Sequence, residues 1–197
     1  MRLMIYICIC IHFLGCTNRS LQERIHPLEI ENTKLQNKVF EYQYRYETER
    51  NMNEFCMKYL GSKITNDNIY WGTDSSKMFT FSSLTNKGRL FLYFSSKMCS
   101  PCIDKFIDIV QKELPEIYNS DQIILIGDMP KRLKQKYYGK KILSGVRLPI
   151  DSIVAPIAFV VHSGKQEIEY LHIFNKSNPQ RTTLYMRKIR KIEFNLE

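Results

Sequence analysis

Apolar residues in the middle of the chain change from a continuous run to a helical spacing, and two cysteines lie at the change. Residues 89–96 (RLFLYFSS) form an apolar and aromatic run of strand length. Downstream, apolar side chains recur with the spacing of one helix face: Cys102, Ile103, Phe106, Ile107, Val110 and Leu114. The pattern therefore predicts a buried strand, a short turn and an amphipathic helix that stops at Leu114-Pro115.

Further apolar runs predict the remaining strands of a sheet. Residues 122–126 and 155–161 have the composition of buried strands, and residues 166–174 predict an antiparallel partner for the second of these. Residues 141–148 predict a short additional strand. Two short segments, 69–72 and 78–81, flank a cluster of turn residues and predict a β-hairpin.

Two more helices are expected in the same part of the chain. One is predicted between Asp128, a capping residue, and Gly139, which favours a helix end. The other begins at Asn178-Pro179. Its expected buried stripe contains Leu184, Tyr185, Ile189 and Ile192.

Residues 21–60 have a different character, rich in Glu, Gln, Asn, Lys and Tyr, with a single proline near the start. Their apolar positions have helical spacing: Leu28, Leu35, Val39, Tyr42 and Tyr46. Asn32 interrupts this stripe, and about two and a half heptads are fewer than a coiled coil needs. We therefore predict a helical stalk, whose Tyr-rich stripe could alternatively dock onto the following domain. Residues 62–68 are interpreted as a linker.

The chain begins with a positive residue and an apolar run that ends at Gly15-Cys16. The run is about a dozen residues long, which suits a signal peptide and is too short to span a bilayer comfortably. The Gly15-Cys16 junction resembles the lipobox of bacterial lipoproteins. This resemblance implies lipidation of Cys16 and removal of residues 1–15, including Cys8 and Cys10; the alternative is an uncleaved apolar start.

Length and charge complete the expected organisation. With 197 residues, 44% of them hydrophobic, the chain can form one sizeable core plus an appendage. We predict a signal peptide (1–15), a lipid anchor with stalk (16–65) and a globular domain (66–197). The net charge of +9 becomes 9 − 1 = +8 after loss of Arg2. An exported, lipid-anchored protein meets no nucleic acid, so basic clusters are interpreted as solvated faces or, alternatively, as contacts to anionic headgroups.

The candidate chemistry lies in Cys99-Ser100-Pro101-Cys102. A cysteine at a helix N-terminus meets free amide N–H groups and the positive end of the helix dipole, which favour its thiolate. Such thiols can have a pKa of about 3.5 to 7.5 instead of about 8.5. The second cysteine lies within one helical turn of the first, close enough for a disulfide. This arrangement indicates a redox switch.

This order of elements, with the C-S-P-C motif after a strand and Pro156 before a late hairpin, resembles the thioredoxin superfamily. The resemblance covers roughly residues 66–197 and points to the membrane-tethered redoxins that carry an extra N-terminal hairpin. It implies an α/β, thioredoxin-like fold in which a mixed sheet is flanked by helices. It also implies that Cys99 attacks a disulfide, that Cys102 resolves the mixed disulfide, and that Ser100-Pro101 constrains the turn.

The resemblance assigns a second segment to the same site. Ala155 would precede a cis Pro156 whose loop lies against the disulfide and presents backbone to a substrate chain. Pro149 is a competing candidate for this position. Two positions depart from the family pattern: Met98 stands where Trp is common, and Tyr93 stands where many members have a carboxylate that transfers protons.

The predicted function is a thiol–disulfide oxidoreductase of the cell envelope, anchored by lipid and facing the periplasm. Its expected partners are exported protein thiols and disulfides and an unknown redox partner, and no cofactor is expected. The alternatives are a non-catalytic binding module with a structural disulfide and a copper carrier using Met98, Cys99 and Cys102. A zinc site would need a second ligand pair, which the sequence lacks. Cys56 is expected to be a buried thiol, and dimerisation through it or through the stalk is the alternative.

Overall fold

The computed structural model describes residues 2–64, 68–72, 74–78, 80–85, 89–128, 137–148, 150, 154–162 and 165–196. Side chains are described from Leu21 onward, except that of Asp128. The chain forms two compact units, Met1–Arg50 and Asn51–Glu197.

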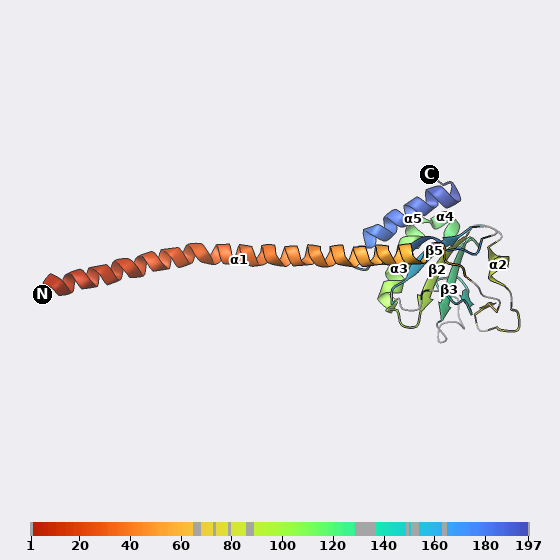
Figure 1. The fold of residues 1–197 in the computed structure, drawn as a ribbon, viewed down its shortest axis with the longest axis horizontal. Helices are drawn as coiled ribbons and strands as arrows, with labels where there is room; N and C mark the ends of the chain where they lie inside the picture. The colour runs from red at the N-terminus through yellow and green to blue at the C-terminus, as the bar shows by residue number, and fades with distance from the viewer. Residues whose placement is uncertain are drawn as a thin grey trace. The chain divides into compact units, whose positions relative to one another are not determined.

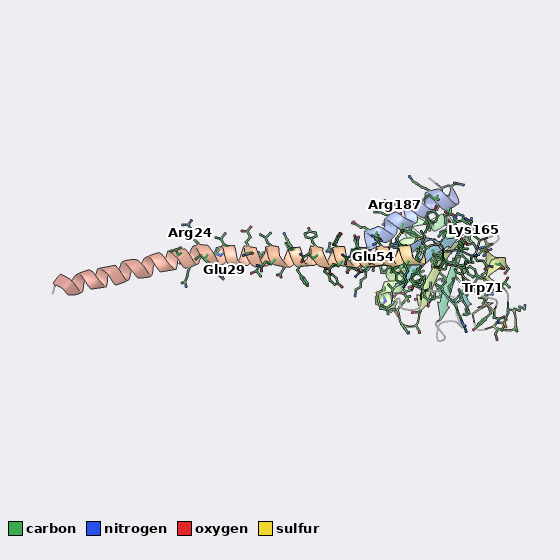
Figure 2. All side chains as sticks on the ribbon, viewed as in Figure 1. Arg24, Glu29, Glu54, Trp71, Lys165 and Arg187 are labelled. Atoms are coloured by element: carbon green, nitrogen blue, oxygen red, sulfur yellow. A yellow bond between two sulfur atoms is a disulfide. The ribbon has the colours of Figure 1, made fainter. Side chains whose placement is uncertain are left out.

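The first unit is helical. Helix α1 runs from Arg2 to Tyr59 and so contains nearly all of residues 21–60, for which a helix was predicted. The predicted helix is confirmed. Its side chains between residues 21 and 47 are exposed along the helix (Figure 2). No helix among the residues that were described is long and apolar enough to cross a membrane.

The second unit is built on a mixed six-stranded sheet in the order β1-β4-β3-β2-β5-β6. Strands β2, β3 and β5 of this sheet are labelled in Figure 1. The strands are β1 (Tyr70–Trp71), β2 (Arg89–Ser95), β3 (Ile123–Asp128), β4 (Ile142–Ser144), β5 (Ile157–Val161) and β6 (Glu169–Ile173). Strands β2, β3 and β4 are parallel, whereas β5 pairs antiparallel with both β2 and β6. This sheet, with its helices, confirms the predicted α/β, thioredoxin-like fold.

The helices that accompany the sheet in the described part of the chain are α2 (Phe81–Leu84), α3 (Ser100–Glu113), α4 (Pro115–Tyr118) and α5 (Pro179–Phe194). Helix α3 has the apolar face that its sequence predicts, and its C-cap residue is Leu114, directly before a proline. Helices α3 and α5 pack against each other, and Arg187 of α5 binds the Glu113 carboxylate of α3 with an N–O distance of 2.8 Å.

The core has two layers, one on each face of the sheet. Leu90, Leu92 and Phe94 of β2 contribute to the layer that contains α3 and α5, whereas Phe91 contributes to the opposite layer with Phe81 of α2. Because both faces of β2 are covered, this strand has a continuous apolar sequence instead of an alternating one.

The predicted hairpin between residues 69–72 and 78–81 is wrong. Tyr70 and Trp71 instead pair with Ser144 and Leu143 of β4, and Phe81 begins α2. Short apolar segments do not distinguish a strand from a buried helical turn, and the preferred strand partner lies some seventy residues away.

The predicted linker also differs from what is observed. Residues 61–64 follow α1 and hydrogen-bond to residues 166–168, with Gly61 N to Ile168 O at 2.8 Å and Ile64 N to Gln166 O at 2.7 Å. Ile64 is fully buried. This segment is therefore part of the folded unit, because its backbone is hydrogen-bonded to the residues that lead into β6, with an isolated antiparallel bridge between Lys63 and Glu167.

The last helix is present as predicted, but only part of its predicted stripe is buried. Ile189 is buried and Tyr185 packs against the core, whereas Leu184 and Ile192 are exposed. Thr182 and Met186 are buried instead. The buried face is selected by contacts with α3 and β6, including a hydrogen bond between Thr182 and His172, and not by apolar spacing alone. Most of the helix expected over residues 128–139 lies outside the described residues.

Candidate functional site

The two cysteines lie where β2 is followed by α3. A short turn links Ser95 to Cys99, which is the N-cap residue of α3, and Cys102 is in the first helical turn. The two sulfur atoms form a disulfide, and the Cα–Cα distance is 5.3 Å. Cys99 is exposed and Cys102 is half-buried against the core layer that contains α3. The disulfide therefore joins an exposed cysteine to one that the domain covers in part.

The turn before Cys99 is fixed by Met98. Its backbone N–H donates to Ser95 O at 3.1 Å, and its sulfur accepts the Ser95 N–H at 3.3 Å. Only 6% of Met98 is exposed. The thioether thus serves as a hydrophobic anchor and backbone acceptor, which holds Cys99 at the helix start. In the disulfide form, the Met98 sulfur is therefore buried and hydrogen-bonded to the backbone.

The backbone around Cys99 limits the hydrogen-bond donors that its sulfur can use. An N-cap side chain ordinarily accepts from the second or third N–H of the helix. Here the second residue is Pro101, which has no N–H. The third N–H, that of Cys102, donates to Cys99 O at 3.1 Å. No cap hydrogen bond to the Cys99 side chain is formed.

An aromatic group that the sequence did not reveal lies beside the first turns of α3. The Tyr138 hydroxyl donates a hydrogen bond to the Asp104 carboxylate. Burial and this bond raise the pKa of Tyr138 well above its usual value. Tyr137 packs edge-on against Phe94, with a centroid distance of 6.3 Å. No sequence signal placed these residues here, because they lie in a long connection between β3 and β4.

Tyr93 stands at the position where the family pattern has a carboxylate. It is half-buried near the end of β2. It contacts both core layers. Strand β2 itself contains no Asp or Glu. Among described residues, Asp104 is the acidic side chain closest in sequence after the motif, and it is exposed and bound to Tyr138.

Pro156 lies at the end of β5 that adjoins the carboxyl end of β2. Its neighbour Ile157 is opposite Tyr93 in the antiparallel register, so Pro156 borders the strand end that leads to Cys99. Pro156 is buried, its carbonyl accepts the Phe174 N–H at 2.8 Å, and Ala155 is half-buried. The backbone face that the sequence assigned to substrate is therefore at the same edge of the sheet as the cysteines.

The expected cis bond before Pro156 is wrong, because no peptide bond in the described residues is cis. The trans form of an X–Pro bond is intrinsically favoured by about 0.5–1 kcal/mol. The competing candidate, Pro149, lies outside the described residues.

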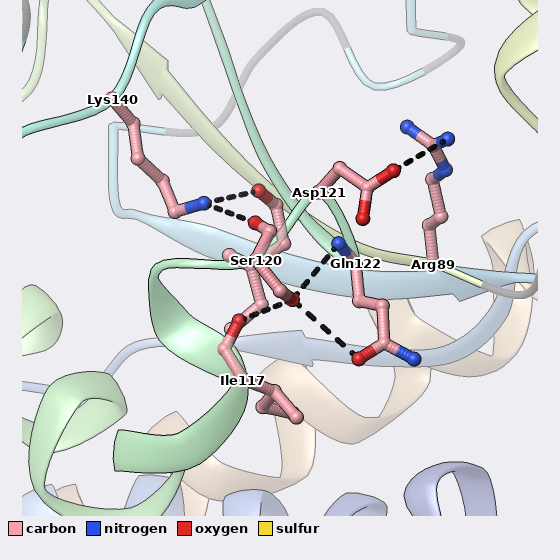
Figure 3. A network of polar contacts seen from close by, with 7 residues as sticks. Arg89, Ile117, Ser120, Asp121, Gln122 and Lys140 are labelled. Carbon is pink, nitrogen blue, oxygen red and sulfur yellow. Dashed lines mark hydrogen bonds and ion pairs between the residues drawn. The ribbon is translucent and has the colours of Figure 1, made fainter.

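A cavity of about 340 Å³ lies at the opposite end of the parallel strands. Lys140 Nζ donates to the carbonyls of Ser120 and Ile123 at 2.6 and 2.9 Å, and Arg89 lies 3.7 Å from Asp121 (Figure 3). Burial lowers the pKa of Lys140. Because Leu90 pairs with Ile123 at the start of both strands, this cavity is remote along β2 from Cys99. Its polar network closes the strand ends and adds nothing to the cysteine site.

Cys56 and Cys16 lie apart from this site in the sequence. Cys56 is half-buried near the end of α1 and is the free cysteine among the side chains described. Burial raises the pKa of its thiol, partly opposed by the charge of Arg181. The side chain of Cys16 lies outside the description. Within the described residues, no group of three or more His, Cys, Asp and Glu side chains could hold a metal ion.

Comparison with known proteins finds no matching family model and no matching curated sequence. Solved structures with a similar fold include an uncharacterized thioredoxin-like protein from Porphyromonas gingivalis, 17% identical over 66% of this chain and 90% of that one, with a TM-score of 0.41. AhpC of Mycobacterium tuberculosis is 12% identical over 68% and 94%, with a TM-score of 0.42. The exposed lipoprotein thioredoxin of Streptococcus pneumoniae is 13% identical over 62% and 98%, with a TM-score of 0.37.

Proposed function

We propose that this protein is a thiol–disulfide oxidoreductase that acts on exported proteins through Cys99 and Cys102. The observation that supports this most is the disulfide between an exposed N-cap cysteine and a half-buried partner in the first turn of the helix. A purely structural disulfide gains nothing from exposing one sulfur at the end of a helix. In the reduced form, the same position exposes the Cys99 thiolate to the positive end of the α3 dipole.

The proposed reaction is two successive exchanges. The Cys99 thiolate attacks one sulfur of a substrate disulfide, the substrate S–S bond breaks, and one substrate thiolate leaves. The Cys102 thiolate then attacks the Cys99 sulfur, breaks the mixed disulfide and releases the second substrate thiolate. The cysteine pair has lost two electrons, and the substrate has gained them and, at neutral pH, two protons. The reverse sequence oxidises a substrate dithiol, and a second thiol–disulfide partner restores the starting state.

The substrate would bind across two backbone segments. Ser100-Pro101 forms the rim on the helix side, and Ala155-Pro156 forms the rim on the β5 side. Register places both at the carboxyl end of β2. Because Tyr93 replaces a proton-transferring carboxylate, deprotonation of Cys102 during the second exchange would depend on solvent. We therefore expect resolution to be the slower of the two exchanges.

The location is part of the same proposal. Lipidation of Cys16 would tether the protein to the envelope membrane on the periplasmic side, where protein disulfides persist. Labelling cells with a radioactive or alkyne-tagged fatty acid would test this. Incorporation should occur in the wild type and disappear in Cys16→Ala, and labelling of both proteins, or of neither, would contradict the anchor.

Trapping tests the chemistry. In Cys102→Ala, Cys99 cannot be released from a mixed disulfide, so adducts with exported proteins should accumulate and disappear on reduction. Cys99→Ala/Cys102→Ala is the matched control and should form none. If Cys102→Ala also forms none, and the wild-type disulfide resists mild reductant, the protein is a non-catalytic binding module and the proposal fails. Metal uptake by the reduced form alone would instead indicate a copper carrier.

A further inference from the structure

Helix α1 carries a row of large apolar side chains that its own unit leaves in solvent. These side chains are 44–69% exposed: Leu21, Ile25, Leu28, Leu35, Val39, Tyr42 and Tyr46. Helices in proteins are stabilised mainly by packing of an apolar face. A helix that exposes such a row along its length therefore needs a partner to cover it.

The exposed row has the alternating spacing of three and four residues that defines a heptad repeat. We call these eight positions the seam, with Ile25, Asn32, Val39 and Tyr46 at position a and Leu21, Leu28, Leu35 and Tyr42 at position d. Apart from Asn32, every seam residue is a large apolar or aromatic one. The repeat begins before Leu28, so the seam is longer than the two and a half heptads evident from the stripe alone.

We propose that the seam joins α1 to the same helix of a second copy of this chain, as a parallel, in-register, two-stranded coiled coil. β-Branched residues at a with Leu at d favour two parallel strands, and Ile25, Val39 and the three leucines follow this rule. Asn32 also favours a parallel, two-stranded pair. A single Asn at position a is best satisfied opposite the same Asn, which fixes both register and direction.

The flanking charges favour the same pairing. Arg24 is at position g and Glu29 is at the following e position, so in a parallel pair each Arg24 faces Glu29 of the other chain. Both side chains project from α1 (Figure 2). Further along, Arg45 would face Arg50, but Glu41 of its own chain binds Arg45 at 2.5 Å and reduces this repulsion. Two Arg24–Glu29 pairs form per dimer.

Pro27 is compatible with this arrangement because it lies at position c, on the outer side of the helix. Its ring does not enter the seam, and α1 continues through it. Parallel pairing also brings both N-terminal ends to one end of the coil. If the proposed lipid anchor is correct, both chains can then attach to the same membrane, although the pairing itself does not depend on the anchor.

Cysteine cross-linking tests the direction and register. The full chain, purified in detergent with all six native cysteines replaced by Ser, serves as background. Leu28→Cys, Leu35→Cys and Tyr42→Cys should each give a disulfide-linked dimer on mild oxidation. Asn37→Cys, at the outward position f, is the matched control and should give no more than the background. Cross-linking at one d position only, or at none, would overturn the parallel, in-register coil.

Charge reversal tests the pairing without any cross-link. Arg24→Glu places like charges opposite each other in both symmetric contacts, and we expect the dimer to dissociate roughly fivefold more readily. Glu29→Arg added to Arg24→Glu should restore the wild-type constant, measured by analytical ultracentrifugation. Asn32→Leu should still associate but yield species larger than a dimer. A wild-type chain that stays monomeric, or a double variant no better than the single one, would overturn the proposal.

Discussion

Pro101 keeps one hydrogen-bond donor away from the Cys99 sulfur, so replacing it with Ala should change the chemistry of that sulfur. In Pro101→Ala, residue 101 regains a backbone N–H at the second helical position. An N-cap side chain accepts from that position. The helix is expected to form as before, because Ala is a good helix former. The substitution therefore adds a donor to the thiolate of the reduced protein with little other change.

The size of the effect follows from the neighbouring donors. The only other backbone donor with suitable position, the Cys102 N–H, already donates to Cys99 O at 3.1 Å. A hydrogen bond to a charged group contributes about 1.5–3 kcal/mol. Sulfur is a weak acceptor and Cys99 is exposed, so we take about 1.4 kcal/mol, which lowers the pKa of the Cys99 thiol by about one unit.

A lower thiol pKa stabilises the reduced protein relative to the disulfide. The reduction potential should therefore become less negative by about 30 mV, because about 1.4 kcal/mol corresponds to this value for a two-electron couple. The pKa would be measured from the pH dependence of Cys99 alkylation, with the modified peptide identified by mass. The potential would be measured by equilibration with glutathione.

Ser100→Ala is the matched control, since it changes the same turn without adding an N–H group. It should leave both quantities close to those of the wild type. If Pro101→Ala has an unchanged or higher Cys99 pKa, the reasoning that the proline withholds a donor is refuted. If Ser100→Ala shifts the pKa equally, the effect comes from the geometry of the turn and not from the donor.

Two further predictions concern stability. Burial, and to a lesser degree Arg181, lower the pKa of His172 to about 3. The unfolded chain binds this proton below about pH 6.5, so the free energy of unfolding should fall by about 1.4 kcal/mol per pH unit as the pH drops from 6.5 towards 3. His172→Gln should flatten this slope in urea titrations, and equal slopes would contradict the assignment. Gly145 has φ +81°, and a Cβ there would lie 2.5 Å from Asn68 O. Gly145→Ala should cost about 2–4 kcal/mol. Gly139 has φ +80° with open space around it, so Gly139→Ala should lose only the part of the free energy of unfolding that comes from backbone strain. Equal losses for the two variants would show that contact with Asn68 O does not contribute.

The sequence predicted those parts of the site that depend on local pattern. The apolar run of β2, the helical spacing of α3 and the cysteines between them are neighbours in the chain, so periodicity alone places them correctly. The antiparallel β5 and β6 were likewise evident from two apolar runs separated by a turn. Met98 was noticed only as a departure from a family pattern, and its anchoring role required the structure.

The predictions that failed depend on contacts between distant segments. Trp71 pairs with Leu143 of β4 and not with a strand close to it in the sequence. The local sequence does not show that β4 is available as a partner. Thr182 is buried while Leu184 is exposed, because a hydrogen bond between Thr182 and His172, 2.8 Å long, helps to set the rotation of α5. The bond before Pro156 is trans although the family resemblance implied cis.

The hydrogen bonds between residues 61–64 and 166–168 have a practical consequence for recombinant work. A fragment cloned from residue 66, where the sequence alone would start the domain, lacks the Ile64 side chain and every one of these bonds. It would leave the peptide groups of residues 166–168, just before β6, without these partners, and other chains can pair with such groups. Soluble preparations suited to crystallisation or enzymology should therefore begin at or before Asn51.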